Sequence, residues 1–377
     1  MKRSTDRILT THTGSLPRPA DLLPMIHARE SGEPYDEQAF HTRVKSAVAE
    51  VVRQQASAGI DIVSDGELGK PSFATYVKNR LSGFEGQNPE RRRFADREEF
   101  AEWNAQVTQP SPSYAAITRP FCTQPLGWKD QTAVETDIAN LKAALQNVQV
   151  EDAFIPSASI GIIAEIMFNR YYATEEAYLF ALADVMKDEY KAITDAGLIL
   201  QIDAPDAAMG RHAQFWDRPL DDFRATLALR VDALNHALAD IPEEQIRYHI
   251  CWGNHDVPLQ DMVDLMLKVK AGAYSVEASN PRHAHEWQVW QDVRLPDGKI
   301  LIPGVIDSTT NFIEHPEVVA GRIVQYANIV GRENVIAGTD CGFGTSAGIP
   351  KVHPTVMWAK FRAMAEGAEL ATKRLWR

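Results

Sequence analysis

The stretch 246-IRYHICWGN-254 sets the expectation for the fold. A short apolar run ends there in two side chains that can bind metal, His249 and Cys251. The pattern recurs in 273-AYSVEASNP-281, which carries Glu277, and in 334-NVIAGTDCGFGT-345, which carries Cys341. Each run has the length of a buried strand. All four side chains are therefore expected at the C-terminal ends of strands, where a parallel barrel builds its active site.

Similar apolar runs alternate with helical patterns along most of the chain. Further strands are predicted within residues 8–19, 59–67, 153–159, 198–205 and 299–308, and helices within 37–58, 174–197, 221–238, 258–272, 315–331 and 353–377. Repeated strand–helix units indicate an α/β protein with a parallel sheet. About eight units over residues 1–377 favour a single (β/α)8 TIM barrel over an open doubly wound sheet. No G-x-G-x-x-G follows the first strand, which weakens the dinucleotide-binding alternative.

Residues 70–130 interrupt this alternation. They contain Gly, Pro, aromatic residues and the charged run 89-PERRRFADREEFAEW-103, and a hairpin is predicted near 115-AAITRPF-121. Loops of this length usually act as lids or binding elements. We therefore predict an insertion after the second strand that serves as a lid. The alternative is a solvated, partly helical excursion.

Composition narrows the class of protein. The chain has 377 residues, 45% hydrophobic and 24% charged, which is typical of a globular protein. A net charge of -12 argues against nucleic acid as the main partner, although a local Arg cluster can still bind a small anion. Three cysteines make a poor disulfide framework. No signal-like stretch follows the start, and no run approaches the roughly 20 apolar residues that span a membrane. We expect a cytoplasmic protein with reduced thiols and no membrane partner.

The strand-end ligands suggest a metal centre. A set of thiolate, imidazole and carboxylate groups suits zinc. Residues i and i+2 of a strand point to the same side, so His249 and Cys251 can bind one ion. Three other histidines, His255, His283 and His285, are competing ligands that we interpret as loop residues; ligation by them would favour a hydrolase. Without the His and Glu, two such cysteines would be interpreted as small buried apolar residues.

Polar side chains also end the other predicted strands. They are His12, Ser15, Asp65, Glu67, Ser157, Ser159, Asp203, Asp307 and Asp340. A barrel would bring them to one mouth. Polar groups that end apolar strands are costly unless they are hydrogen-bonded or used. Strand ends also meet solvent, so each of these residues alone is weak evidence.

Six motifs, in chain order, resemble the C-terminal catalytic barrel of cobalamin-independent methionine synthase. They are TTHTGSLPRP (10–19), DIVSDGE (61–67), LILQIDAP (198–205), HICWGN (249–254), VEAS (276–279) and GTDCGFGT (338–345). The resemblance runs from about Leu9 to Thr345 and is loose over 70–130. It implies a zinc ion held by His249, Cys251, Glu277 and Cys341. It also implies that homocysteine is held by Gly14, Ser15, Glu67 and Asp203.

Three departures from the family pattern leave the alkyl donor open. Ala204 stands where the family has a Glu associated with the folate side. Asp307 and Ser308 replace a strand-end His, and this sequence does not contain the N-terminal half of the full-length synthase. The donor can then be methylfolate, another methyl donor or an epoxide. The superfamily also includes short zinc enzymes such as epoxyalkane:coenzyme M transferase.

The charges of the predicted site favour chemistry on sulfur. Two thiolates and one carboxylate around a dication leave a net charge of -1, a modest Lewis acid that still lowers the pKa of a bound thiol. Hydrolytic zinc has mostly neutral ligands instead. Glu67 and Asp203 suit the ammonium group of an amino thiol, whereas a sulfonate would need Arg or Lys. Asp307 is a candidate general acid, or else a helix cap or a hydrogen-bonded carboxylate.

We therefore predict a zinc-dependent thiol alkyltransferase that acts on a small-molecule thiol and an alkyl donor, with methyl transfer to homocysteine or a similar thiol preferred. The alternative is epoxyalkane:coenzyme M transferase (2-hydroxypropyl-coenzyme M lyase). Two other classes remain: a zinc metallohydrolase and a zinc-stabilised binding module. Aromatic residues within 100–130 and 287–290 are candidates for the pocket mouth or for the subunit contact of a homo-oligomer.

Overall fold

The structure is a computed structural model that describes residues 1–89, 94–107, 118–253 and 255–377. Its centre is an eight-stranded sheet in the order β1-β10-β9-β8-β7-β6-β5-β2, and all the pairings are parallel. The strands are β1 (Leu9–Thr10), β2 (Ile62–Ser64), β5 (Asp152–Ala158), β6 (Ile199–Asp203), β7 (Ile246–His249), β8 (Ala273–Val276), β9 (Ile300–Ile306) and β10 (Ile336–Thr339). A bridge between Thr11 and Ile62 joins the two edges. The sheet is therefore a nearly closed barrel, which confirms the predicted TIM-barrel fold.

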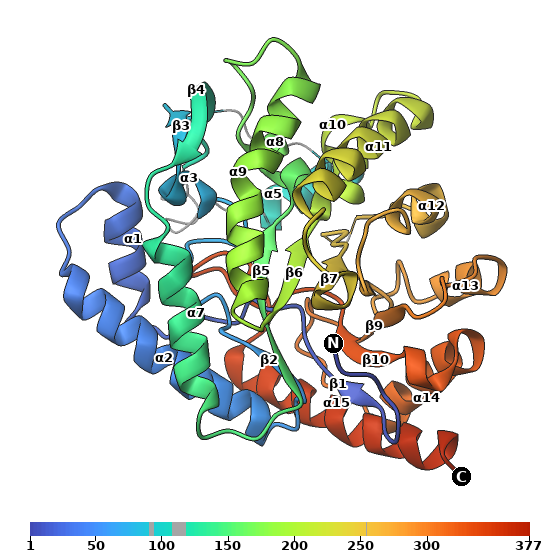
Figure 1. Ribbon diagram of the computed structural model, residues 1–377. Coiled ribbons are helices and arrows are strands. Elements are labelled where there is room, and N and C mark those ends of the chain that lie inside the picture. The colour runs from blue at the N-terminus through green and yellow to red at the C-terminus, as the bar shows by residue number, and fades with distance from the viewer. Residues whose placement is uncertain (90–93, 108–117, 254) are drawn as a thin grey trace.

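Helices surround this barrel (Figure 1). They are α1 (Leu23–Ser31), α2 (Glu37–Ser57), α7 (Thr132–Leu145), α8 (Ile160–Ile166), α9 (Glu175–Asp195), α10 (Gly210–Gln214), α11 (Leu220–Ala237), α12 (Val263–Met266), α13 (Val289–Asp292), α14 (Pro316–Val330) and α15 (Pro354–Leu375). The caps of α2 and α9 are Asp36 and Thr174, whose side chains accept backbone N–H bonds and so fix where each helix begins. Among the described residues, no helix is long and apolar enough to cross a membrane.

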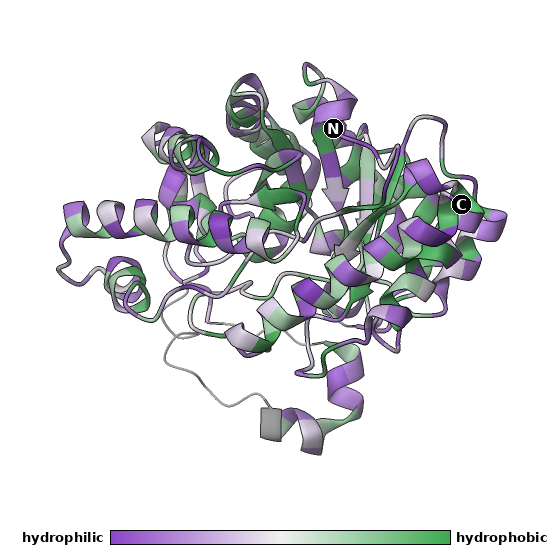
Figure 2. Ribbon diagram, turned by 90° about the horizontal axis from the view of Figure 1, so that it is seen from below, coloured by the Kyte–Doolittle hydropathy of each residue, from purple (hydrophilic) through white to green (hydrophobic). Residues whose placement is uncertain are grey.

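The apolar interior lies at the N-terminal half of the barrel. Its buried cluster consists of Leu9, Ile62, Phe154, Ile199, Ala273, Ile300, Ile302 and Ile336. Most of these residues open their strands, so they fill the base of the barrel. In Figure 2 the strands are mostly green, whereas the surrounding helices carry purple residues. The polar strand ends are thus left for the opposite mouth.

The helix predicted over 258–272 is present but much shorter than predicted. That segment forms a short 3-10 turn, η3 (Leu259–Asp261), followed by the four residues of α12. The backbone leaves helical geometry at Met262, with φ -139°. The buried residues in this stretch are Leu259, Met262, Val263, Leu265, Met266, Val269 and Ala271. Gln260, Asp264 and Lys268 stay exposed at four-residue spacing, so the amphipathic pattern is real and it is the backbone at Met262 that ends helical geometry.

The predicted insertion after the second strand is confirmed. It contains α3 (Val77–Arg80), β3 (Leu81–Glu85), α4 (Ala95–Glu99), α5 (Ala101–Val107) and β4 (Phe121–Trp128). Strands β3 and β4 pair antiparallel as a separate two-stranded sheet. The hairpin predicted near 115–121 falls partly on residues 115–117, outside the described residues, and β4 begins at Phe121. The role of the insertion as a lid stays a prediction.

Candidate active site

Three of the four predicted metal ligands come together at the C-terminal mouth of the barrel. His249 ends β7, Cys251 follows two residues later, and Cys341 follows β10. One ligand atom from each residue lies within 4.8 Å of the others, and this is the group of possible metal ligands found among the described residues. The two Sγ atoms are 3.1 Å apart and both cysteines are free. Strand ends far apart in sequence therefore form one cluster of soft and borderline donors.

Glu277, the fourth predicted ligand, lies beside this group. Its Oε1 is 3.8 Å from the Cys251 Sγ. The Trp252 N–H donates to Oε1 at 2.9 Å, and Asn280 Nδ2 donates to Oε2 at 2.9 Å. Burial, followed by the nearby Cys341 charge, raises the pKa of Glu277 to about 8. The carboxylate is thus held in place by hydrogen bonds in a setting that disfavours its charge unless a cation is present.

The donor atoms fit a metal ion. The Nε2 atom of His249 is buried and has no hydrogen-bond partner in the described structure, while Nδ1 lies 3.3 Å from the Ser275 Oγ. Burial lowers the pKa of His249 to about 3, so its ring is neutral at neutral pH, which is the form that ligates metals. The Cys251 thiol hydrogen-bonds to Cys341 and lowers the pKa of the Cys341 thiol. An unpartnered imidazole nitrogen beside two thiols is what a soft or borderline cation requires.

Glu67 and Asp203 lie on the other side of the mouth. Glu67 is buried, and neither of its carboxylate oxygens has a partner in the described structure. Its backbone has φ 55°, a strained conformation for a residue with a side chain. Burial raises the pKa of Glu67 to about 7 and, together with the charge of Glu67, raises that of Asp203. Asp203 accepts one bond, from Gln201 Nε2 at 2.7 Å. The charges of Lys70 and Arg18 oppose the rise in the pKa of Glu67 only in part, and neither cation hydrogen-bonds to its oxygens in the described structure.

Gly14 and Ser15 connect the two sides. At φ 121° a Cβ on Gly14 would come within 2.5 Å of the Pro156 side chain and 3.4 Å of Glu67 Oε1, so only glycine permits this approach. The carbonyl of Ser15 accepts N–H bonds from Phe343 and Gly344, in the loop that follows Cys341. All four residues predicted to hold the substrate therefore lie at the mouth where the sulfur atoms meet.

Comparison with known families agrees with this geometry. Residues 161–364, more than half of the chain, match the family described as the catalytic domain of cobalamin-independent synthase. The chain belongs to this family. Two curated methionine synthases are similar to this family member. The protein of Thermococcus kodakarensis is 26% identical over 370 residues, which cover 98% of this chain and 94% of the relative. That of Pyrococcus furiosus is 27% identical over 335 residues, which cover 88% and 85%.

Solved structures show the same fold. A B12-independent methionine synthase from Shewanella sp. W3-18-1, in complex with selenomethionine, superposes with a TM-score of 0.73 at 21% identity, covering 98% of this chain and 99% of that chain. A putative vitamin-B12 independent methionine synthase from Listeria monocytogenes gives a TM-score of 0.67 at 18% identity, covering 96% and 98%. At these identities the likeness speaks for the fold of this family member and not for its substrates.

Asp307, the predicted candidate acid, caps a turn in this family member. Its carboxylate accepts bonds from the Thr309 N–H at 3.0 Å, the Thr309 hydroxyl at 2.8 Å and the Thr310 N–H at 2.9 Å. These contacts match the alternative of a hydrogen-bonded carboxylate and not that of a helix cap, since the next described helix, α14, begins at Pro316. The role of general acid stays a prediction that these contacts do not favour.

A sulfonate substrate would need Arg or Lys, and five such residues near the predicted strand ends and in the insertion have protein partners. Arg18 donates to the carbonyls of Leu16, Gly344 and Lys70, and Lys70 donates to the Pro156 carbonyl. Arg80 pairs with Glu189 and Asp137, and Arg211 donates to the carbonyls of Phe215 and Arg218. Arg170 lies over the Phe121 ring. The carboxylate side of the mouth is therefore better prepared for an ammonium group than for an anion.

One group at the mouth was not predicted from the sequence. Asp96, in helix α4 of the insertion, accepts from His255 Nδ1 at 2.7 Å and from Arg282 at 2.5 Å. His255 follows Cys251 by four residues and Arg282 follows Glu277 by five. Helix α4 is thus fastened to the two loops that carry ligands. The sequence signal was only an acidic residue inside a charged run.

His283, a competing ligand in the sequence, is buried, and both of its ring nitrogens have protein partners. Its Nδ1 lies 2.9 Å from Glu286 Oε2 and its Nε2 lies 3.0 Å from the His255 carbonyl.

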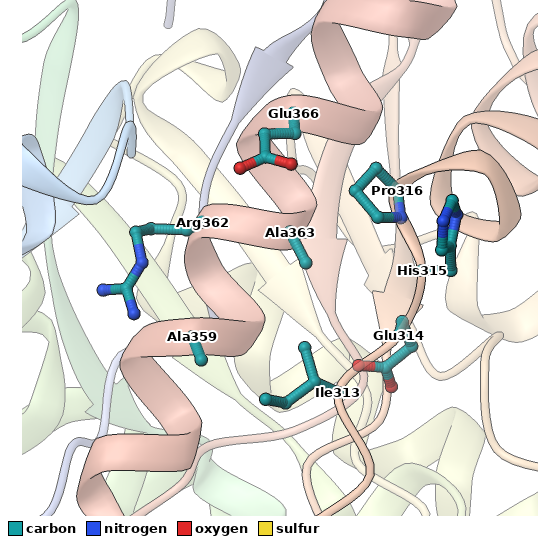
Figure 3. A pocket seen from close by; sticks show the side chains of 8 residues that line it. All are labelled: Ile313, Glu314, His315, Pro316, Ala359, Arg362, Ala363 and Glu366. Atoms are coloured by element: carbon teal, nitrogen blue, oxygen red, sulfur yellow. The ribbon is translucent and has the colours of Figure 1, made fainter.

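A surface hollow of about 350 Å³ lies between the segment leading into α14 and helix α15 (Figure 3). Its lining residues are Ile313, Glu314, His315, Pro316, Ala359, Arg362, Ala363 and Glu366. None of them is a predicted site residue, so this hollow is separate from the candidate site.

Proposed function

We propose that this chain is a zinc-dependent methyltransferase that methylates the sulfur of homocysteine or of a similar amino thiol. The observation that carries the proposal is the convergence of His249, Cys251 and Cys341 within 4.8 Å, with Glu277 beside them. Membership of the cobalamin-independent synthase family and the similarity to proteins named methionine synthase support it.

The metal would be held by His249, Cys251, Glu277 and Cys341. Zinc with such ligands lowers the pKa of a substrate thiol and leaves the thiolate nucleophilic. The chain supplies the orientation: the Trp252 N–H and the Asn280 amide each fix one oxygen of Glu277. In the reaction a carbon–sulfur bond forms, the bond between the methyl group and its donor breaks, and the thiol proton leaves.

Glu67 and Asp203 would bind the ammonium group of the thiol substrate. Buried carboxylates with raised pKa values become stable anions when a cation faces them. An ammonium group supplies that charge, together with donors for the open oxygens of Glu67. A sulfonate such as that of coenzyme M would add another anion to a mouth whose cations are already bonded to protein groups. An amino thiol is therefore favoured over the epoxide-opening alternative.

The test combines metal analysis with a substrate cross-test. We expect the purified protein to bind about one zinc per chain and homocysteine to change the visible spectrum of the cobalt-substituted form. Each thiol, homocysteine or coenzyme M, is then incubated with each donor, methylfolate, a methyl corrinoid or an epoxide. Methionine should form from homocysteine, and the donor that supports it is thereby identified. A coenzyme M–epoxide adduct without methionine, or hydrolysis that needs no thiol, would contradict the proposal.

A further inference from the structure

Two of the proposed ligands come from strands that are not neighbours. Glu277 follows β8 and Cys341 follows β10, and β9 lies between these strands in the sheet. The loop after β8 and the strand end of β10 therefore have no ladder of backbone hydrogen bonds to fix their separation. Some other contact has to connect the two ligands across β9.

Asp340 makes that contact. Its Oδ1 accepts the backbone N–H groups of Ala278 and Ser279, both at 2.8 Å. Its Oδ2 accepts the backbone N–H of Asn280 at 2.8 Å and the Asn280 side-chain amide at 3.1 Å. One buried carboxylate thus holds the three residues that directly follow Glu277.

Gly304 in β9 provides the space for this crossing. A Cβ at Gly304 would lie 2.1 Å from Asp340 Oδ1 and 2.7 Å from the Asp340 backbone N and Cα, closer than real contacts allow. The Asp340 carboxylate therefore passes over the one position of the intervening strand that lacks a side chain. The arrangement depends on a glycine in one strand and an aspartate in the next.

Asn280 extends the contact to the ligand itself. Its amide Nδ2 donates both to Asp340 Oδ2 and to Glu277 Oε2, at 3.1 and 2.9 Å. A continuous path of hydrogen bonds runs from the residue that precedes Cys341 to the carboxylate of Glu277. Partners of this kind orient a ligand before a metal arrives, and their loss typically costs about 10- to 100-fold in metal affinity.

We propose that Asp340 and Asn280 are positioning residues that set zinc affinity by fixing Glu277 relative to Cys341 across β9. The inference rests on the proposed metal site. It assigns these two side chains a role in metal binding beyond that of holding the barrel together.

Asp61 provides a matched control at the opposite end of the barrel. Its carboxylate also accepts four hydrogen bonds, two from Arg7 and two from Thr10. It precedes β2, far from the mouth where the ligands meet. If Asp340 only stabilised the fold, Asp340→Asn and Asp61→Asn would behave alike.

The experiment measures zinc affinity by competition with a chromophoric chelator, together with the melting temperature of the metal-free proteins. We expect Asp340→Asn to lower zinc affinity about 10- to 100-fold. Asn280→Ala, which keeps the backbone N–H bond, should lower it less. Gly304→Ala should act like Asp340→Asn, although it leaves every donor and acceptor unchanged. Asp61→Asn should lower the melting temperature and keep wild-type zinc affinity.

A second measurement needs no metal. In the metal-free protein, amide hydrogen exchange of residues 278–280 should be faster in Asp340→Asn than in wild type, and unchanged in Asp61→Asn. Wild-type zinc affinity in Asp340→Asn overturns the inference, and so does wild-type affinity in Asn280→Ala if Asp340→Asn does not fold. A wild-type protein that binds no zinc overturns the proposed function and the inference with it, so the two failures are distinguishable.

Discussion

The buried glutamates on the two sides of the barrel mouth differ in the hydrogen bonds that their carboxylates accept. On the sulfur side, which holds His249, Cys251, Glu277 and Cys341, both oxygens of Glu277 accept hydrogen bonds. On the carboxylate side, which holds Gly14, Ser15, Glu67 and Asp203, neither oxygen of Glu67 has a partner in the described structure. Burial raises the pKa of both glutamates, to about 8 and about 7.

Since burial is common to both, hydrogen bonding is what separates the two roles. A carboxylate that already accepts N–H bonds has a fixed direction, which suits a ligand that has to meet a metal at a set place. A buried carboxylate without partners is costly in the empty protein, and the cost is recovered when a substrate cation binds. The comparison predicts that the two sides can be disabled separately.

The largest effect is expected for Cys341→Ser. A serine hydroxyl does not supply a thiolate to the metal, so zinc affinity should fall by more than the roughly 100-fold limit for residues outside the ligand set. Methyl transfer should fall with it. The fold should persist, since the apolar base of the barrel does not include Cys341. Zinc content, activity and circular dichroism of the variant check these three points.

Cys122→Ser is the matched control for this change. Cys122 is buried in β4, apart from the sulfur cluster, and its Sγ lies 3.6 Å from the Gln124 carbonyl. It should lose some stability and retain zinc. Full zinc occupancy and a wild-type rate in Cys341→Ser would show that Cys341 is not a metal ligand. The division of the mouth into a sulfur side and a carboxylate side would then be wrong.

Glu67→Gln should produce the converse result. The variant loses the charge that faces the substrate ammonium, and a hydrogen bond to a charged group is worth about 1.5–3 kcal/mol. We expect KM for homocysteine to rise by about 10- to 100-fold, since each 1.4 kcal/mol is a factor of ten. Zinc affinity should stay at the wild-type value. Parallel measurement of KM and zinc affinity in Cys341→Ser and Glu67→Gln shows whether the two sides are independent.

The sequence could predict the strand ends because they depend on local pattern. An apolar run followed by His249 and Cys251 predicts both a strand and a pair of side chains on one face, without knowledge of the rest of the chain. The barrel then brings Glu277 and Cys341 to the same mouth, because the C-terminal ends of its parallel strands meet there.

The contacts between loops could not be predicted in this way. Asp96 meets His255 and Arg282 only after the insertion has folded against the barrel. The link from Asp340 to Asn280 depends on the missing side chain of Gly304 in the strand between. The helix predicted over 258–272 shortens to Val263–Met266 because tertiary context can override a local helical pattern, and that pattern does not show where the backbone breaks.

The smallest effect is expected for Asp307→Asn. Asp307 follows β9, between the strands that carry Glu277 and Cys341, and its oxygens already accept three bonds from Thr309 and Thr310. Like Glu277, Asp307 is therefore a carboxylate whose direction is fixed by hydrogen bonds from the protein. The variant should lose about 1 kcal/mol of stability, the usual value of one hydrogen bond, and keep kcat within a few-fold of wild type.

Thr309→Ala removes one donor to Asp307 and leaves the carboxyl group in place, so it should show a similar loss of stability with no change in kcat. A general acid contributes about 10²- to 10⁴-fold to rate. A loss of that size in Asp307→Asn, with Thr309→Ala unaffected, would establish Asp307 as the acid. It would also show that a carboxylate whose oxygens already accept hydrogen bonds can still transfer a proton. The number of hydrogen bonds that a carboxylate accepts would then no longer be enough to assign its role at this mouth.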